Sequence, residues 1–305
     1  MKNKIYRSPL FYVGDKFKLI EEIREHFPSK INKFIEPFTG GGSVFLNIHA
    51  KEYLLNDIDK NVYLLHKFLM KQSSNTSKFL SNVENLIDDY KLSKSFKEDI
   101  VPMSLKNTWK KTFYAKFNKM GFEKLRTDFN NDTKKSILKL YILLIYGFNR
   151  MLRFNTENKY NLPVGNVDFN ANVLNALNEY FILVTSKSIS WYNLDYKKFL
   201  ESIQINENDF VYLDPPYLIT FSEYNKRWNE QKEYELLKIL NELNAKGIKF
   251  AISNVTHYKG KENKLFLQWS KQYKSYPIKS NYISYHDNSI KNFNEVLITN
   301  YVEKK

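Results

Sequence analysis

"INKFIEPFTGGGSVFLNIHAKEYLLNDID", residues 31–59, carries the pattern of an α/β unit. Its first apolar run ends near Glu36 and leads into the glycines Gly40 to Gly42, after which a helix is expected to open at Ser43. The next apolar run, "EYLLN", stops at an acidic residue, Asp57. The stretch therefore predicts a β-turn-α-β unit.

The same alternation of strands and helices returns late in the chain. "SISWYNL" and "DFVYL" read as strands, and the amphipathic "KEYELLKILNELNAKG" reads as a helix closed by Gly247 before a further strand, "IKFAISN". Residues 61–178 have a different texture, rich in Lys and Asn and helical in pattern. We therefore predict an α/β domain formed by residues 1–60 and 179–305, split by a mainly helical domain at residues 61–178.

Charge and composition favour a polyanionic partner. The 305 residues include 47 Lys and Arg against 33 Asp and Glu, a net charge of +14, which suits nucleic acid or an anionic membrane surface. A genome rich in A and T would also enrich Lys and Asn, so this signal is not decisive alone. There are 0 Cys, and the 5 His lack ligand spacing, so we expect no metal.

The chain offers no segment that reads as a signal peptide or a membrane span. Its first residues, "MKNKIYRSPLFYVG", lack an apolar core, and the longest apolar run, "LYILLIYGF", is too short to cross a bilayer. We expect a cytoplasmic protein.

The glycine turn and the acid that follows the second strand predict a nucleoside cofactor. Gly40 to Gly42 allow close approach to a ligand, and Asp57 lies 17 residues after Gly40, near the spacing at which a carboxylate meets ribose hydroxyls. The G-x-G-x-x-G pattern is absent, and Glu36 would repel a pyrophosphate. These features favour S-adenosylmethionine over a nicotinamide dinucleotide, although a tight turn and a helix cap would give the same residues.

The stretch "VYLDPPYLIT", residues 211–220, ends a predicted buried strand with a carboxylate, two prolines and an aromatic ring. Ligands of parallel sheets lie beyond the carboxyl ends of strands, so Asp214 is expected in the crevice. Pro215 and Pro216 stiffen the turn and leave carbonyl oxygens to accept from a ligand, and Tyr217 supplies a stacking face. This set suits an extruded nucleobase whose amine meets Asp214. Alone, it would also fit a simple turn.

The chain resembles the Dam-type, D12 class of DNA adenine N6-methyltransferases over nearly its whole length. The shared motifs are "FYVGDK", "FIEPFTGGGSV", "LLNDID", "GFNRMLRFNTENKYNLPVG", "DFVYLDPPYLIT" and "NEVLITNY", in that order, and "DPPYLIT" followed by "EYNKRW" looks most like the T-even phage members. The resemblance implies a Rossmann-like S-adenosylmethionine-dependent domain with an inserted DNA-recognition domain.

The resemblance also assigns residues. The catalytic residues it implies are Asp214, Pro215 and Tyr217, and those around S-adenosylmethionine are Tyr12, Lys16, Phe38, Gly40, Gly42, Asp57, Asp195, Tyr196 and Asp214. A cation such as Lys16 suits the methionine carboxylate. The DNA-binding residues it implies are Phe148, Asn149, Met151, Arg153, Asn155 and Pro163. On composition alone, most of this last group would be helix core and solvated surface.

The predicted function is methyl transfer from S-adenosylmethionine to N6 of adenine in double-stranded DNA, by base flipping and without a metal. A GATC site is the expected target, because "FNRMLRFN" resembles the reading segment of Dam-type enzymes and this resemblance implies that Arg153 contacts a guanine. Another site with a GAT core, such as GATATC, stays open, since Asn166 and Val167 stand where phage GATC enzymes commonly carry basic residues. A cognate restriction endonuclease is a possible genetic partner. An RNA adenine methyltransferase, a non-catalytic nucleic-acid-binding protein and a glutamine-modifying methyltransferase are the alternatives.

Overall fold

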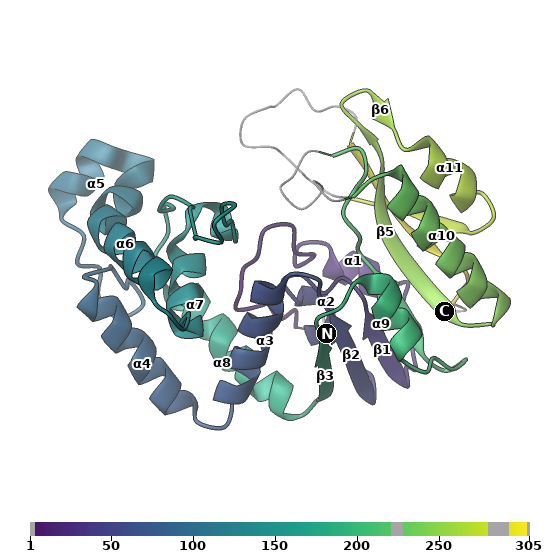
Figure 1. The fold of residues 1–305 in the computed structure, drawn as a ribbon, viewed down its shortest axis with the longest axis horizontal. Helices are drawn as coiled ribbons and strands as arrows, with labels where there is room; N and C mark the ends of the chain where they lie inside the picture. The colour runs from purple at the N-terminus through teal and green to yellow at the C-terminus, as the bar shows by residue number, and fades with distance from the viewer. Residues whose placement is uncertain (1–3, 221–227, 280–292, 304–305) are drawn as a thin grey trace. The chain divides into compact units, whose positions relative to one another are not determined.

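The computed structural model describes residues 4–220, 228–279 and 293–303 (Figure 1). These residues form two compact units. Unit 1 consists of Met1–Asp15, Gly40–Leu46 and Asp59–Ser186, and unit 2 consists of Lys16–Thr39, Asn47–Ile58 and Lys187–Lys305. The predicted α/β fold class is confirmed by unit 2, which holds a central sheet flanked by helices.

Unit 2 is built on one sheet with the strand order β3-β2-β1-β4-β5-β8-β7, and β6 pairs with β5. The strands are β1 (Lys33–Glu36), β2 (Glu52–Asn56), β3 (Ser188–Tyr192), β4 (Phe210–Leu213), β5 (Lys249–Tyr258), β6 (Lys261–Glu262), β7 (Lys274–Ile278) and β8 (Phe293–Thr299). Strands β3, β2, β1, β4 and β5 are parallel, whereas β8 runs antiparallel to both β5 and β7. The order reverses between β1 and β4, where open α/β sheets place their ligands.

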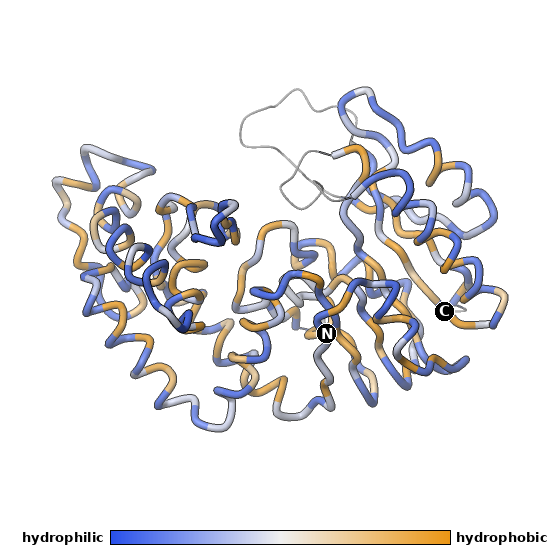
Figure 2. The backbone as a smooth tube through the Cα atoms, in the orientation of Figure 1, coloured by the Kyte–Doolittle hydropathy of each residue, from blue (hydrophilic) through white to orange (hydrophobic). Residues whose placement is uncertain are grey.

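The central strands of unit 2 are apolar on both faces, as expected for buried parallel strands. On one face Ile35, Val211 and Leu213 belong to the core that includes the helices α9 (Tyr196–Ser202), α10 (Glu230–Ala245) and α11 (Lys264–Ser270). On the other face Phe34, Phe210 and Tyr212 surround Phe27 at ring-centroid distances of 4.7 to 6.4 Å. Figure 2 shows the resulting run of hydrophobic residues along β1, β2 and β5.

Short polar residues set the limits of the helices in unit 2. Asn229 caps α10 by accepting from the backbone N–H of Lys232 at 3.0 Å. Just after the helix Gly247 has φ 71°, which confirms the glycine stop predicted there. The short helix α1 (Ile20–Arg24) buries Ile20 and Ile23.

Unit 1 is helical apart from isolated β-bridges within its described residues. Its helices are α2 (Ser43–Leu46), α3 (Lys60–Gln72), α4 (Thr76–Asp89), α5 (Met103–Trp109), α6 (Phe113–Asn131), α7 (Ile137–Tyr146) and α8 (Ala171–Thr185), with the 3-10 turns η1 (Lys110–Thr112) and η2 (Phe148–Arg150). Helix α7 is the centre, because every residue of its second half is buried and α3, α4 and α6 all pack on it.

The two units do not coincide with the predicted domain limits. Four described segments that were expected with the sheet group with the helices instead, namely residues 4–15, 40–46, 59–60 and 179–186. The reason is local packing: α2 lies on α8, and a Cβ built on Gly41 would stand 3.1 Å from Tyr12 and 3.0 Å from Asp15. The helix expected at Ser43 is present, but it is a single turn.

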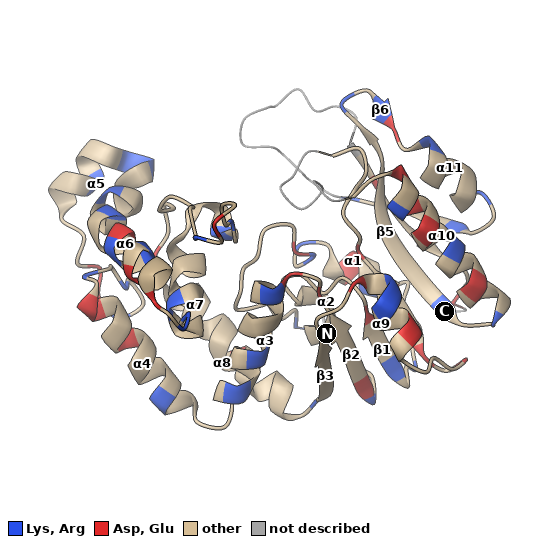
Figure 3. Ribbon diagram, in the orientation of Figure 1, with Lys and Arg blue, Asp and Glu red and all other residues tan. Residues whose placement is uncertain are grey.

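Basic residues lie on several helices of unit 1, and Figure 3 shows them on α3, α5 and α6. In the described parts of the chain, we find no helix with both the length and the hydropathy needed to cross a membrane.

Candidate active site

Four polar side chains of unit 2 meet where β4 ends. Lys16 Nζ lies 2.7 Å from Asp214 Oδ2 and donates to the Tyr217 hydroxyl at 2.8 Å. That hydroxyl lies within hydrogen-bonding distance of two carboxylates, 3.0 Å from Asp214 Oδ1 and 2.9 Å from Glu295 Oε1 on β8, and it can donate to one of them at a time. We call Lys16, Asp214, Tyr217 and Glu295 the buried quartet.

The buried quartet places two carboxylates beside one ammonium group. The side chains of Lys16 and Glu295 are 3% and 0% exposed, and that of Asp214 is 19% exposed. Burial raises the pKa of the Asp214 carboxyl, Lys16 opposes the rise, and Glu295 adds to it. Lys16 Nζ is also 3.5 Å from Glu295, so one cation serves both acids. The site is therefore suited to receive a further donor or positive charge.

A buried asparagine holds the ends of three parallel strands together. Asn56, the last residue of β2, donates to the carbonyls of Pro37 and Leu194 at 2.9 and 3.0 Å, and its side-chain oxygen accepts from Leu194 N. Asp57 follows directly and is half-buried, with its carbonyl bonded by Asn193 at 2.7 Å. The acid predicted to meet a ribose therefore stands at the carboxyl edge of the sheet.

Three aromatic rings of unit 2 lie together near this edge. The ring of Phe38 is 5.2 Å from that of Tyr196 and 5.8 Å from that of Trp228, and the last two are 5.7 Å apart. Tyr196 is buried, and its hydroxyl donates to the carbonyl of Lys232. The carboxylate of Asp195 caps α9 through Lys197 N at 3.0 Å, so this residue has a structural task beside the predicted cofactor role.

Trp228 is held in turn by a buried carboxylate. Its indole N–H donates to Glu233 Oε2 at 2.6 Å, and Glu233 Oε1 accepts from Asn254 and Asn263 at 2.9 Å each. Burial raises the pKa of Glu233, and these three donors oppose the rise. Most of the "EYNKRW" motif, residues 223–227, lies outside the described residues.

The glycine turn belongs to unit 1 and is held by a buried histidine. Gly40 and Gly42 have φ of 50° and 81°, a region that disfavours other residues. His66 of α3 donates from Nε2 to the Gly40 carbonyl at 2.9 Å, and burial lowers its pKa to about 4, so the ring is neutral at pH 7. Tyr12, also predicted at the cofactor, is buried in the same unit.

The predicted DNA-binding residues lie in a loop between α7 and α8 of unit 1. Phe148 is 46% exposed, and its N–H donates to the Pro163 carbonyl at 3.0 Å, which brings these two residues together. Asn149 has φ 52° and is exposed, while Met151 is half-buried. The exposed Phe148 ring thus lies next to Asn149, whose positive φ is uncommon for a residue other than glycine.

Arg153 and Asn155 organise the far end of the loop. Arg153 donates to the side-chain and main-chain oxygens of Asn161 at 2.9 and 3.0 Å. Asn155 Oδ1 accepts from the N–H groups of Glu157 and Lys159 at 3.1 and 2.9 Å, which closes a turn.

Asn166, which stands in place of a basic residue, has a structural partner. Its side-chain oxygen accepts from Tyr114 N and Ala115 N at the start of α6, and its amide donates to the Lys111 carbonyl. These hydrogen bonds of Asn166 attach the start of α6 to the loop between α7 and α8.

Sequence reasoning missed three polar residues that organise these sites. Glu295 lies inside one of the shared motifs but was assigned no role, and the signal was an acid in an otherwise apolar strand, "EVLIT". Asn56 and His66 were equally visible as polar residues among apolar neighbours of a strand and a helix. A buried polar residue requires a partner, and that requirement was the available clue.

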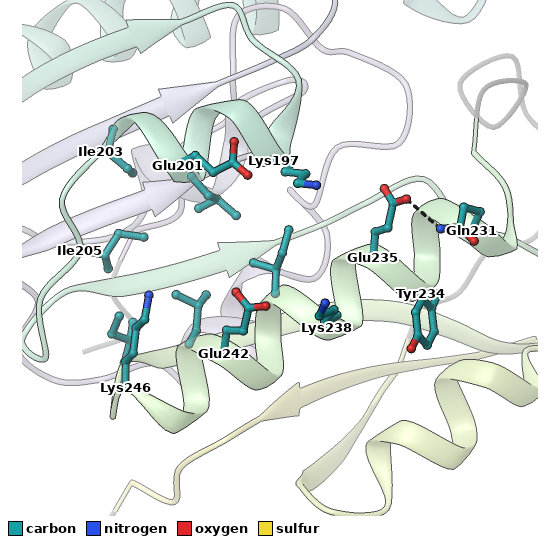
Figure 4. A pocket seen from close by; sticks show the side chains of 14 residues that line it. Lys197, Glu201, Ile203, Ile205, Gln231, Tyr234, Glu235, Lys238, Glu242 and Lys246 are labelled. Atoms are coloured by element: carbon teal, nitrogen blue, oxygen red, sulfur yellow. Dashed lines mark hydrogen bonds between the residues drawn. The ribbon is translucent and has the colours of Figure 1, made fainter.

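A separate groove lies between α9 and α10 of unit 2, with a volume of about 480 Å³ (Figure 4). Lys197, Glu201, Glu235 and Lys238 line it, and Gln231 donates to Glu235 at 2.8 Å. None of the predicted site residues lines this groove, so it is distinct from the buried quartet.

Comparison with known proteins agrees with the site. The family model of the D12 class N6 adenine-specific DNA methyltransferases matches residues 12–284. The chain is 36% identical to the Type II methyltransferase M.FokI of Planomicrobium okeanokoites over 98% of its own length and 43% of that protein. It is 33% identical to the modification methylase StsI of Streptococcus sanguinis, over 99% of this chain and 44% of that one.

The chain thus spans less than half the length of these two relatives. A third relative, the DNA adenine methylase of Haemophilus influenzae, is 31% identical over 74% of this chain and 69% of its own. The family match covers most of the chain, including the segments that carry Lys16, Asp57 and Asp214. The chain therefore belongs to the D12 class N6 adenine-specific DNA methyltransferase family.

Proposed function

We propose that this chain transfers a methyl group from S-adenosylmethionine to N6 of adenine in double-stranded DNA. The buried quartet carries the proposal. It combines a carboxylate of raised pKa with an aromatic ring at the point where the strand order reverses. This point, at the carboxyl ends of the strands, is where open α/β sheets bind nucleoside ligands.

The proposed chemistry needs a carboxylate that accepts from an amine. S-adenosylmethionine, when bound, supplies an electrophilic methyl group on a positively charged sulfur. Asp214 accepts a hydrogen bond from the N6 amine and turns the nitrogen lone pair toward that methyl group. When nitrogen gains the methyl group it must release a proton, and an acid of raised pKa is suited to take it.

The buried quartet also holds Asp214 in place for this task. Lys16 fixes one carboxylate oxygen at 2.7 Å, and Tyr217 lies 3.0 Å from the other. Glu295 leaves the quartet one negative charge in excess when both acids are ionised, which favours positive charge developing on the amine. The ring of Tyr217 is proposed to stack on the flipped adenine, with Pro215 offering its carbonyl to the amine.

The residues proposed for the cofactor have the right chemical types. Asp57 suits the ribose hydroxyls, and Phe38 and Tyr196 suit the adenine ring. In unit 1 the left-handed backbone of Gly40 and Gly42 is the kind that lets a chain approach a ligand closely. We propose Tyr12, Lys16, Asp195 and Asp214 as further members. Lys16 is already engaged by Asp214, so we expect it to act through that carboxylate as well as on the methionine end.

We propose that unit 1 reads the DNA and that residues 61–178 act as its recognition insertion. Phe148 and Met151 are proposed to wedge beside the flipped base, Asn149 and Asn155 to contact the DNA, and Arg153 to read a guanine. Pro163 lies against the Phe148 backbone and is proposed to share that contact. The proposed target is GATC, with other GAT-containing sites such as GATATC as the alternative.

The relatives suggest the biological setting. Two of them are named as a Type II methyltransferase and a modification methylase. We propose that this chain likewise protects DNA against a cognate restriction endonuclease.

Binding and transfer assays test the proposal. Calorimetry should detect S-adenosylmethionine binding, and labelled methyl groups should enter duplex DNA in preference to RNA or a glutamine peptide. Asp214→Asn, which keeps the shape but removes the charge, should stop transfer while DNA binding persists. Preference for RNA would support the RNA alternative, and absence of cofactor binding would support a non-catalytic protein.

A further inference from the structure

Two arginines of unit 1 lie over a single buried phenyl ring. The guanidinium carbon of Arg7 is 4.3 Å from the centroid of the Phe11 ring, and that of Arg150 is 4.2 Å from the same centroid. The guanidinium carbon of Arg7 therefore lies no farther from that of Arg150 than the sum of their two distances from the Phe11 centroid. Phe11 is only 5% exposed, so the ring is enclosed and the two cations are half-buried around it. We call these three residues the arginine clamp.

The arginine clamp holds two positively charged groups, and no carboxylate among the described residues forms an ion pair with Arg150. Burial lowers the pKa of Arg150 to about 10, with the charge of Arg7 acting in the same direction, yet the group stays protonated at pH 7. Among the described residues Arg150 forms no ion pair, and its Nε is buried without a hydrogen-bond partner. Asp15 attracts Arg7 and offsets part of its charge, so the excess positive charge of the clamp lies mainly on Arg150 and favours an anion there.

The other charged and titratable groups near the clamp do not neutralise Arg150. Asp15 and Asp168 attract it only at a distance, and Tyr141 donates its hydroxyl to the Pro9 carbonyl at 3.1 Å. Asp168 is occupied, since it accepts from the N–H and the hydroxyl of Ser95 at 2.6 and 2.8 Å. The guanidinium of Arg150 therefore keeps donors available for a ligand.

The backbone around the clamp is strained. Phe11, Asn149 and Arg150 all have positive φ, at 48°, 52° and 50°, although none of them is glycine. Non-glycine residues in this region are costly and persist where other interactions hold them, often at ligand clamps. Positive φ occurs at Phe11, which supplies the ring, and at Arg150, which supplies one of the cations. The fold therefore imposes this backbone conformation on both of the segments that form the contact.

We propose that Arg7 and Arg150 together bind a phosphate of the DNA backbone, with the Phe11 ring fixing their guanidinium groups. The inference rests on the proposed function, because Arg150 lies within the proposed reading loop, between Asn149 and Met151. Guanidinium groups match phosphate oxygens with paired hydrogen bonds, and stacking on a ring reduces the freedom that such binding would otherwise cost. The clamp contacts backbone and not bases, so it positions the loop for every sequence alike.

Single-phosphate neutralisation tests this assignment. A set of duplexes carries one uncharged methylphosphonate at each backbone position in turn, and affinity for the full chain is measured by fluorescence anisotropy at fixed salt. With the unaltered chain, neutralising the clamped phosphate, or two neighbouring ones, should weaken binding about tenfold. With Arg150→Gln the unmodified duplex should bind about as weakly, and neutralising the same position should cost nothing further.

Two more variants make the result specific. With Arg7→Gln, neutralising the same phosphate should likewise cause no further loss of affinity. Each variant should also make the slope of log affinity against log salt concentration less negative by about 1. Lys78→Gln, which removes an equal charge from the exposed surface of α4, should leave the sensitive position unchanged. Thermal melting of each variant identifies losses that come from unfolding.

The outcomes separate this inference from the proposed function. If the unaltered chain methylates DNA but neither arginine variant changes the phosphate profile, the clamp is structural and the inference is wrong. The inference is equally wrong if the variants lower only the melting temperature. If the unaltered chain neither binds nor methylates DNA, the proposed function itself fails.

Discussion

Lys16→Met should destabilise unit 2 because it leaves two buried carboxylates without their cation. Lys16 Nζ is 2.7 Å from Asp214 and 3.5 Å from Glu295. At an effective dielectric constant of about 20, these separations correspond to attractions of about 6 and about 5 kcal/mol before desolvation is subtracted. Removing one partner of a buried ion pair typically costs about 3–5 kcal/mol, and we expect a loss in that range for the free energy of unfolding.

The loss should depend on pH in a defined direction. Burial and Glu295 already raise the pKa of Asp214, and Lys16 holds it down, so the variant raises it further. An acid whose pKa is higher in the folded state binds more protons there, so its contribution is favourable at low pH and is lost as pH rises through the folded value. The difference between Lys16→Met and the unaltered chain should therefore shrink as pH falls from 8 toward 5.

Urea unfolding followed by tryptophan fluorescence measures this effect, since Trp191, Trp228 and Trp269 all belong to unit 2. Adding Glu295→Gln to Lys16→Met should recover part of the loss by removing one of the two acids.

Lys187→Met is the matched control for this prediction. Lys187 is a half-buried lysine that donates to Tyr53 and to the Ile48 carbonyl and forms no ion pair among the described residues. Burial lowers its pKa to about 8, so the lysine contributes more stability as pH rises, and the cost of removing it should increase between pH 8 and 10. A loss below about 1 kcal/mol for Lys16→Met at pH 8, the size of an exposed pair, would refute the reasoning.

Three further predictions concern unit 1. Gly42→Ala should destabilise it by about 2–4 kcal/mol and weaken cofactor binding, because φ is 81° and the new Cβ would stand 2.6 Å from Phe45; differential scanning calorimetry and cofactor titration check this. His66→Gln should flatten the pH dependence of stability between 4 and 6.5, where a buried neutral histidine loses stability as pH falls; urea titrations across that window show it. Arg153→Ala should cost about 1–3 kcal/mol at one base pair of the target, whereas Asn161→Ala, which removes only a loop tie, should weaken all sequences alike; competition binding with single-base variants decides between them.

Much of unit 2 was predictable because its signals are local. The run "DFVYL" indicated β4, "SISWY" indicated β3, and Gly247 marked the end of α10, since each depends on neighbouring residues alone. The location of the candidate site at the carboxyl ends of the strands could then be predicted from the general rule for parallel sheets.

What remained hidden depends on residues far apart in the chain. Glu295 lies 78 residues after Tyr217, and only the antiparallel placement of β8 brings its carboxylate to the buried quartet. The engagement of Lys16 by Asp214 was likewise invisible, because sequence spacing says nothing about which of several acids a lysine will meet. The grouping of residues 1–15 with the helices has the same origin, in packing between distant segments.

We propose that the buried quartet promotes the transfer of a methyl group to N6 of adenine in duplex DNA. This proposal is tested by a single-turnover reaction with S-adenosylmethionine and an unmethylated GATC-containing duplex, whose products are digested to nucleosides and analysed by mass spectrometry. The unaltered chain should form N6-methyldeoxyadenosine, and Asp214→Asn should form it at least about a hundredfold more slowly while binding the duplex equally well. Methyl groups found only on cytosine or on protein would exclude adenine N6 as the target, and an Asp214→Asn rate close to that of the unaltered chain would exclude the role proposed for Asp214.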